Sequence, residues 1–429
     1  MNVEVRNTHV VNRPSTGERI RARREARGMT RPVLAGLVGR SADWLKKIEN
    51  GDRPLNSLNL LIALARSLGI ADLSELAGND FEAPVQAWKN DVHHAVPAIR
   101  LAMRAVSFGQ LSVNTVVTNT VVTNTDLPVL AADDLDRQVK QLWLLWHRSP
   151  MQRSEVGRSL PTLIRQAHAS IRATDGIERR HSRSAAADLY RLVQRLLAHI
   201  CEPELHSLAV ERGRALSEEA DSPMSLALAA WASSVGLCAS GYYAEAAHLA
   251  DRGADALLAV CGDDLTAAAM GTIGALHLEA AAAHGFAGRE GDAYRDLDAA
   301  AAVAERMPSG AWHLPSAFDR RNVEILAVIV AVSLRRSGEA IARAHKIDLS
   351  GTTSVVRRSR LLLERAQAHA NRRELKDAVH SLDAAARTSP EAVALIPWAR
   401  TLADELAEQA PQAVRAEARR LKSRLTTIS

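Results

Sequence analysis

Apolar residues along this chain recur at intervals of three and four, the spacing that places them on one face of a helix. From Leu130 to Leu425 this pattern is interrupted only by short segments rich in Gly, Pro, Asp and Ser. Residues 17–78 form a second, shorter block with five helical patterns. We therefore predict an all-α fold in which a small N-terminal domain precedes a long helical region. Residues 1–16 lack the pattern and are predicted to be disordered.

The N-terminal block carries clear signals for where its helices begin and end. Helices are expected over residues 18–27, 30–38, 41–50 and 57–68, with a short fifth helix around Leu73 and Leu76. Thr30 and Ser41 are residue types that cap helix N-termini, and Gly39 can form the tight turn between the second and third helices. Leu45 and Ile48 are predicted to face the core.

The run from Thr30 to Gly51 resembles the Cro and phage-repressor (XRE-type) helix-turn-helix family. The matching skeleton consists of Thr30, Leu34, Ala35, Gly39, Ser41, Leu45, Ile48, Glu49 and Gly51, followed by Pro54, Leu60 and residues 65–69. The resemblance implies a five-helix domain over residues 17–78 that binds double-stranded DNA. In this family the second helix of the motif lies in the major groove.

Carried over by position, the resemblance also implies a set of DNA-binding residues. Ala42, Asp43 and Lys47 would face the bases, with Trp44 and Lys46 on the same outer face of the helix. Arg31 and Ser41 would approach phosphates or the groove edge, and Arg53 the DNA backbone. Asp43 has an alternative role, because an acidic residue near a helix N-terminus stabilises the helix itself.

Residues 79–130 are predicted to form a linker. It contains one helical stretch, Val85 to Arg104, followed by the unit Asn-Thr-Val-Val-Thr repeated with a period of five between Val113 and Thr125. This period fits neither a helix nor a strand, which favours a flexible tether. A short β-hairpin is the alternative interpretation.

Residues 131–429 contain degenerate repeats of the tetratricopeptide type. Ala246, Ala293, Ala340 and Ala378 each follow a turn signal at the position where paired helices approach closely. We therefore predict a tetratricopeptide-like α-solenoid that senses an effector and forms the dimer. A generic alanine-rich helix bundle is the alternative. The amphipathic end, Ala413 to Leu425, could pack on a partner chain or merely cap the solenoid.

The order of features resembles a family of regulators from high-GC Gram-positive (actinobacterial) organisms, and more loosely the peptide-pheromone receptors of Gram-positive bacteria. The clearest pieces are Val96–Arg100, Leu142–His147, Leu160-Pro161, Ala167-His168, Trp312, Phe318, Asn322 and Ser389–Glu391. One cluster combines aromatic, cationic and amide groups that could bind an effector: Trp312, His313, Phe318, Arg321 and Asn322. Alternatively, Trp312 and Phe318 fill the core and Asn322 caps a turn.

Charge supports nucleic acid as the partner of the N-terminal block. Gly17 to Arg53 contains ten Lys or Arg and five Asp or Glu, a net charge of 10 − 5 = +5, which equals the formal charge of the whole chain. A basic domain on a neutral body favours binding to the DNA backbone.

Other classes find no support in the sequence. No apolar run is long enough to cross a membrane and no signal-peptide core is present, so we expect a cytoplasmic protein. Cys201, Cys238 and Cys261 are widely spaced and are expected to be reduced. Nucleotide-binding, zinc-protease and hydrolase motifs are missing, so no enzyme activity, cofactor or metal is expected.

The leading hypothesis is a sequence-specific transcription regulator that acts as a homodimer and responds to a peptide, a small molecule or a protein. The alternative is a helical scaffold, or a pheromone-receptor-like regulator, that acts on a protein target.

Overall fold

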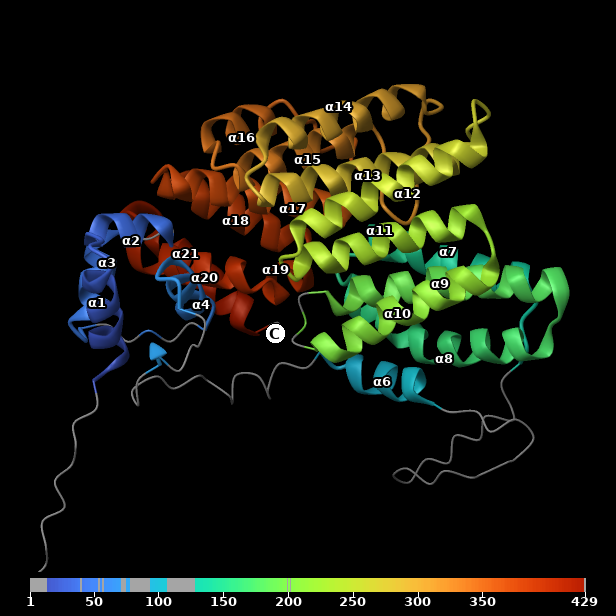
Figure 1. The fold of residues 1–429 in the computed structure, drawn as a ribbon, viewed down its shortest axis with the longest axis horizontal. Coiled ribbons are helices and arrows are strands. Elements are labelled where there is room, and N and C mark those ends of the chain that lie inside the picture. The colour runs from blue at the N-terminus through green and yellow to red at the C-terminus, as the bar shows by residue number, and fades with distance from the viewer. Residues whose placement is uncertain are drawn as a thin grey trace, which may run out of the picture. The chain divides into compact units, whose positions relative to one another are not determined.

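The computed structural model describes residues 14–38, 41–52, 55, 58–70, 75–77, 93–105, 128–198, 200 and 202–427. These residues form an all-α fold, as the sequence predicts (Figure 1). The chain divides into two units, residues 1–91 and 92–429. Residues 1–13 of the segment predicted to be disordered and the Val113–Thr125 tether lie outside the described residues. The prediction is wrong at its end, because Ser15 caps α1 and Thr16 begins it.

The first unit consists of α1 (Thr16–Ala26), α2 (Arg31–Leu37), α3 (Ala42–Glu49) and α4 (Leu58–Ser67). Its core combines apolar residues of all four helices with three leucines outside them: Ile20, Leu34, Ala35, Leu45, Ile48, Leu55, Leu61, Leu64, Ala65, Leu68 and Leu76. Helices α1 and α3 approach closely, because a Cβ atom on Gly17 would lie 2.1 Å from the carbonyl oxygen of Ile48. Leu73, expected in a fifth helix, lies outside the described residues.

The second unit contains the remaining helices. These are α6 (Val96–Arg104), α7 (Ala132–Arg148), α8 (Gln152–Ala173), α9 (Gly176–Leu197), α10 (Pro203–Ala220), α11 (Pro223–Ala239), α12 (Tyr243–Cys261), α13 (Ala267–Phe286), α14 (Glu290–Arg306), α15 (Arg320–Ser333), α16 (Ser337–Ala344), α17 (Val355–Asn371), α18 (Leu375–Thr388), α19 (Pro390–Leu395), α20 (Pro397–Gln409) and α21 (Gln412–Thr427). None of the helices in the described part of the chain is both long and apolar enough to span a membrane.

Of the helix expected from Val85 to Arg104, residues 85–92 lie outside the described residues, and residues 96–104 form α6. It packs against α8, so this segment belongs to the second unit rather than to a free linker. Its inward side chains, Val96, Ile99 and Met103, are buried in the same core as α7 to α9. The sequence pattern located the helix but could not show where it packs.

From α9 to α18 the second unit is built from successive helix hairpins. Ala246, Ala293, Ala340 and Ala378 are all fully buried at the start of the second helix of a hairpin, where the repeat pattern placed them. Small side chains there allow the paired helices to approach closely. The first helices, α9, α11, α13, α15 and α17, also contact one another in succession. They therefore form the inner layer of a curved stack.

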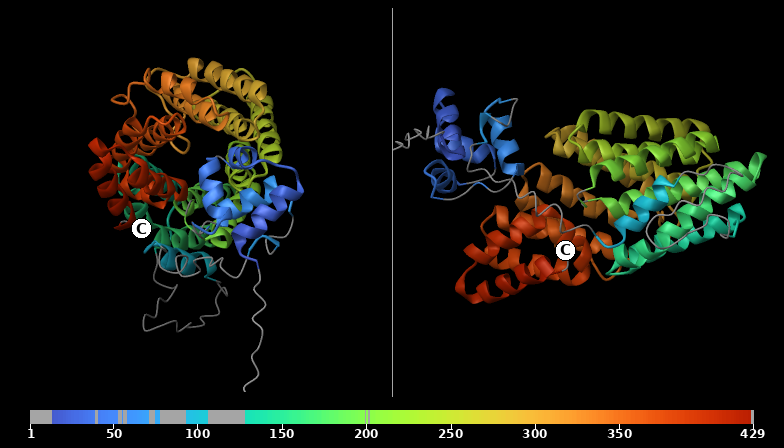
Figure 2. Two further views of the ribbon diagram at one scale, coloured as in Figure 1. Left: turned by 90° about the vertical axis from the view of Figure 1, so that its left-hand side faces the viewer. Right: turned by 90° about the horizontal axis from the view of Figure 1, so that it is seen from below.

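The stack curves until its last helices contact its first (Figure 2). His147 on α7 bonds through Nδ1 to Ser354 Oγ at 2.8 Å and through Nε2 to the carbonyl oxygen of Leu314 at 2.9 Å. Glu391 on α19 accepts from the backbone N–H groups of Arg153 and Ser154 on α8, at 2.9 and 3.1 Å. We call these the closing contacts.

The imidazole of His147 is neutral in this arrangement. Burial, followed by the charge of Arg357, lowers the pKa of His147 to about 3. A carbonyl oxygen can only accept, so Nε2–H donates to Leu314 and Nδ1 accepts from the hydroxyl of Ser354. One uncharged side chain therefore joins the start of the stack to two segments near its end.

The C-terminal helix α21 uses its apolar face within the chain. Val414, Ala418, Leu421 and Leu425 are buried in one core with residues of α17, α18 and α20. The amphipathic pattern of Ala413 to Leu425 is thus explained by capping of the stack. No apolar face of this segment is left for a partner chain.

Candidate nucleic-acid interface

Helix α3 is amphipathic and well defined at both ends. Ser41 caps it, since the backbone N–H of Trp44 donates to Ser41 Oγ at 3.1 Å. It ends at Glu49, and Gly51 follows in the left-handed region at φ +78°, a conformation that costs glycine little. Leu45 and Ile48 point into the core. By contrast, Thr30 precedes α2 as predicted but makes no capping hydrogen bond through its side chain.

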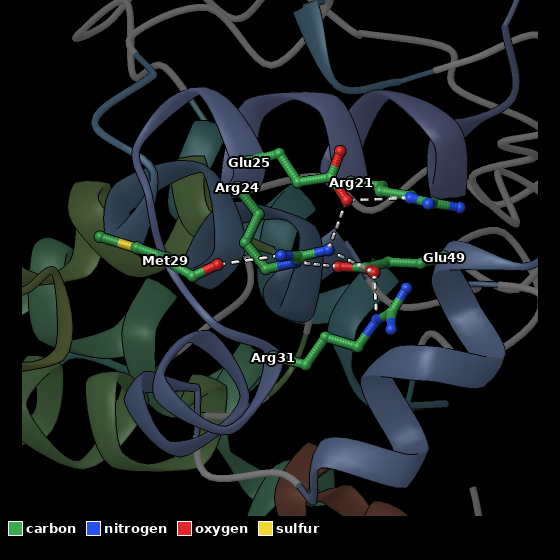
Figure 3. A network of polar contacts seen from close by, with 6 residues as sticks. All are labelled: Arg21, Arg24, Glu25, Met29, Arg31 and Glu49. Atoms are coloured by element: carbon green, nitrogen blue, oxygen red, sulfur yellow. Dashed lines mark hydrogen bonds and ion pairs between the residues drawn. The ribbon is translucent and has the colours of Figure 1, made fainter.

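A buried ion pair links α1 to the end of α3 (Figure 3). Arg24, which is 6% exposed, donates from Nε to Glu49 Oε1 at 2.6 Å and from Nη2 to Glu49 Oε2 at 3.0 Å. Arg24 Nη1 also donates to the carbonyl oxygen of Met29 at 2.9 Å. The hydrogen bond to Glu49 is the largest of the effects that raise the pKa of Arg24, so the guanidinium stays charged despite burial.

The same carboxylate holds Arg31 at the start of α2. Arg31 Nε donates to Glu49 Oε2 at 2.7 Å, while its side chain remains 32% exposed. One side of the Arg31 guanidinium is therefore fixed by Glu49, and the rest can reach solvent. This geometry positions a cation at the surface with little freedom to move.

An open hollow of about 590 Å³ lies between α1, the start of α2 and the start of α3. Its lining is Arg21, Arg24, Glu25, Arg31, Pro32, Ala42, Asp43 and Lys46. Four of these eight residues are basic and two are acidic, so the lining carries a net positive charge. Polyanions are attracted to such a surface.

The remaining predicted residues lie on or beside the exposed face of α3. Lys46 and Lys47 are exposed, and Lys47 Nζ lies 2.9 Å from Asp43 Oδ2, one helical turn away. Ala42 is half-buried in the hollow. Trp44 is also half-buried and packs against the core, so it is partly a structural residue. Arg53 lies outside the described residues.

Comparison with known families explains this arrangement. Residues 16–77 match the family model of a helix-turn-helix domain. The first unit carries a helix-turn-helix DNA-binding domain. In such a domain α2 and α3 are the two helices of the motif, and α3 is the one that enters the major groove. Comparisons with curated proteins and with solved structures gave no match.

The helix-turn-helix domain contains further candidate site residues that the sequence analysis did not single out. Arg21 lines the same hollow as Arg31. Glu49, which is paired with Arg24, holds Arg31 through its carboxylate. A signal was present, because Arg24 stands one turn after Ile20 in the inward stripe of α1. A charged residue in an apolar stripe must find a partner in the core, but spacing alone did not identify Glu49.

The predicted effector residues in the second unit mostly have structural partners. Trp312, His313 and Phe318 lie in the segment that joins α14 to α15, while Arg321 and Asn322 lie in the first turn of α15. His313 N donates to the carbonyl oxygen of Phe318 at 2.9 Å. Phe318 is fully buried against Gly274 of α13, and the ring of Trp312 meets His147 edge-on with centroids 5.2 Å apart.

His313 and Arg321 also have partners within the chain, whereas Oδ1 of buried Asn322 has no hydrogen-bond partner among the described residues. His313 is buried, bonds to Ser316 Oγ at 2.7 Å, and has its pKa lowered to about 3, first by burial. Exposed Arg321 donates from Nη1 to the carbonyl oxygen of Gly351 at 2.5 Å. Asn322 does not cap the turn through its side chain, since Asp319 is the cap and Asn322 N donates to it. An effector role for these residues stays a prediction.

Proposed function

We propose that this protein is a sequence-specific transcription regulator of the XRE type, located in the cytoplasm and without enzymatic activity. The observation that carries the proposal is the match of residues 16–77 to a helix-turn-helix domain, together with the basic hollow at the start of α3. In this proposal α3 reads base edges and the cations around the hollow bind phosphates.

We further propose that the second unit, a tetratricopeptide-like solenoid, controls DNA binding in response to an effector. Two features support this. Its inner layer of helices is continuous, and its closing contacts join segments more than 160 residues apart, so a ligand on the inner face could act on the whole unit. A homodimer would supply two copies of α3, because one recognition helix contacts too few base pairs to specify a site.

The test is selection of genomic DNA fragments with the purified full-length protein, followed by footprinting of the preferred fragment. We expect protection of two half-sites about one helical turn apart. Affinity should fall steeply with salt concentration, because cations such as Arg31 and Lys46 displace counterions. The slope of log affinity against log salt should become shallower by about 0.9 for each phosphate-binding cation replaced. A DNA affinity that does not change with salt concentration, or no binding to any fragment, would favour the scaffold alternative.

Lys47→Ala should weaken binding to the selected operator by about 1–3 kcal/mol if Lys47 contacts a base. In the structure, Lys47 Nζ lies 2.9 Å from Asp43 Oδ2. This ion pair is exposed, so a base edge can replace it at little cost in free energy. Lys422→Ala is the matched control, because Lys422 forms a similar exposed ion pair with Asp404 in the second unit. Equal affinities of the Lys47 variant and this control would remove Lys47 from the base-reading set.

A further inference from the structure

Several charged side chains on the inner helices of the second unit form no ion pair with the described residues, and three of them come from different helices. Arg195 lies on α9, Glu279 on α13 and Arg357 on α17, and all three are half-buried. None forms an ion pair within 4.0 Å with any described residue. Charged groups that lose part of their hydration usually recover it through a partner, so the missing partners need an explanation.

The surroundings hold these side chains in place without neutralising them. The Arg195 guanidinium lies over the ring of Trp231 on α11, with Cζ 4.6 Å from the ring centroid, and makes no hydrogen bond with the described residues. Arg357 Nη2 donates to the carbonyl oxygen of Ser316 at 2.6 Å. Both side chains are therefore oriented, while most of their N–H donors remain available.

The three groups are close enough to influence one another. Burial has the largest effect on Arg357, and the charge of Arg195 follows; together they lower the pKa of Arg357 to about 9. Burial also raises the pKa of Glu279, and the charges of Arg195 and Arg357 both oppose this rise. Beside Glu279, the pKa of the Cys238 thiol is raised to about 12, first by burial, so the thiol stays uncharged.

Other nearby groups do not supply the missing anion. Asp319, the second carboxylate that acts on Arg357, already caps α15 by accepting from Asn322 N at 2.7 Å. Burial and the charges of both arginines lower the pKa of His147 to about 3, so its ring is neutral. Two planar guanidiniums close enough to influence one another suit a carboxylate or a phosphate, which they can bind through paired hydrogen bonds.

We propose that Arg195 and Arg357 bind the oxyanion group, carboxylate or phosphate, of a small ligand, and that Glu279 accepts a hydrogen bond from an amino or hydroxyl group of the same ligand. This names the chemical class of the effector, and to that extent it rests on the proposed function. The binding itself is measured without DNA, so failure of operator binding and failure of this site can be distinguished.

The test uses the full-length protein and three probes, succinate, L-aspartate and inorganic phosphate, each compared with sodium chloride at equal ionic strength. A ligand that binds the folded state raises the unfolding temperature in a saturable way. We expect such a rise with the carboxylates or with phosphate, and the stronger probe identifies the kind of oxyanion. No saturable rise with any probe would overturn the proposal.

Arg195→Gln should weaken the response at least tenfold, and Arg195→Lys should weaken it less because the charge remains. Arg419→Gln is the matched control, since Arg419 is exposed on α21 and forms no ion pair with the described residues. Equal responses of wild type and Arg195→Gln would show that the anion acts elsewhere.

If Arg195→Gln fails to fold by circular dichroism, Glu279→Gln provides the second test. Wild type should prefer L-aspartate over succinate, and the Glu279 variant should lose that preference; a preference unchanged by the substitution would refute the role of Glu279.

Discussion

Glu49→Ala is expected to destabilise the helix-turn-helix domain strongly and to weaken its DNA binding. The substitution leaves the Arg24 guanidinium, which is 6% exposed, without its carboxylate partner. Removing one member of a buried ion pair costs about 3–5 kcal/mol. A domain spanning residues 16–77 has a total stability of about 6 kcal/mol at roughly 0.1 kcal/mol per residue. The loss would therefore consume most of it.

The measurement is hydrogen exchange of peptides from residues 16–50 in the full-length protein, combined with operator binding. Glu25→Ala is the matched control. Glu25 also contacts Arg24, at 3.2 Å, and Arg21, at 3.0 Å, but it is exposed, so its loss should leave exchange nearly unchanged. Similar exchange in the two variants would contradict the central role of Glu49.

A double variant separates folding from function. Arg24→Met with Glu49→Met replaces the pair by apolar side chains, which often restores stability. It also leaves Arg31 without the carboxylate that holds its Nε. We expect the double variant to be folded yet weaker in DNA binding than wild type. Wild-type affinity in a folded double variant would show that Arg31 needs no positioning.

Local patterns in the sequence predicted the recognition helix well. Ser41 caps α3, and Leu45 and Ile48 face the core, as the helical period requires. These features depend on residues within one or two turns of each other, where backbone geometry determines which side chains share a face. The match of residues 16–77 to a helix-turn-helix domain confirms the class of domain that the motif predicted.

Contacts between distant segments were not predictable in this way. The Arg24–Glu49 pair spans 25 residues, and the bonds from His147 to Leu314 and Ser354 span 167 and 207. No periodicity encodes such partners. His147 and Glu391 did lie in segments that carry the resemblance to a regulator family, and the structure places them in the closing contacts of the stack.

The proposed effector cluster shows the same limit. Residue types alone suggested binding, because Trp312, His313 and Asn322 together offer stacking and hydrogen bonding. The structure turns this segment inward, where His313 bonds to Ser316 and the ring of Trp312 packs on His147. The unpaired charges at Arg195, Glu279 and Arg357 come from three different hairpins. They share a site only because the stack curves.

Glu391→Gln is expected to open the closing contacts and destabilise the second unit by about 3 kcal/mol or more. Glu391 is 3% exposed and accepts hydrogen bonds from the backbone and hydroxyl of Ser154 and from Arg153 N. Glutamine replaces one of the two carboxylate oxygens by an NH₂ group, which cannot accept a hydrogen bond. At least one N–H or O–H donor of Arg153 or Ser154 would then lose its acceptor. Buried polar groups left without partners cost about 1–3 kcal/mol each.

The effect has a defined dependence on pH. Burial alone would raise the pKa of Glu391, but the His93 ring, whose Nε2 lies 3.7 Å away, and the donors of Ser154 outweigh it and lower the pKa to about 2. Relative to an ordinary value of 4.5, this depression corresponds to about 3 kcal/mol of stability. Because the folded-state pKa is the lower one, that stability is fully present above about pH 4.5 and is lost as the pH falls towards 2.

Urea unfolding at pH 5 and pH 3 measures this contribution, with hydrogen exchange of peptides around residues 150–156 and 388–395 to locate it. Wild type should lose more stability between the two pH values than Glu391→Gln, which has no carboxylate left to titrate at that position. Glu204→Gln is the matched control, because Glu204 is exposed in the same unit and its nearest cation, Arg104, is 4.0 Å away. This control should keep the wild-type dependence on pH. If Glu391→Gln also keeps it, the closing contacts do not depend on the charge of Glu391.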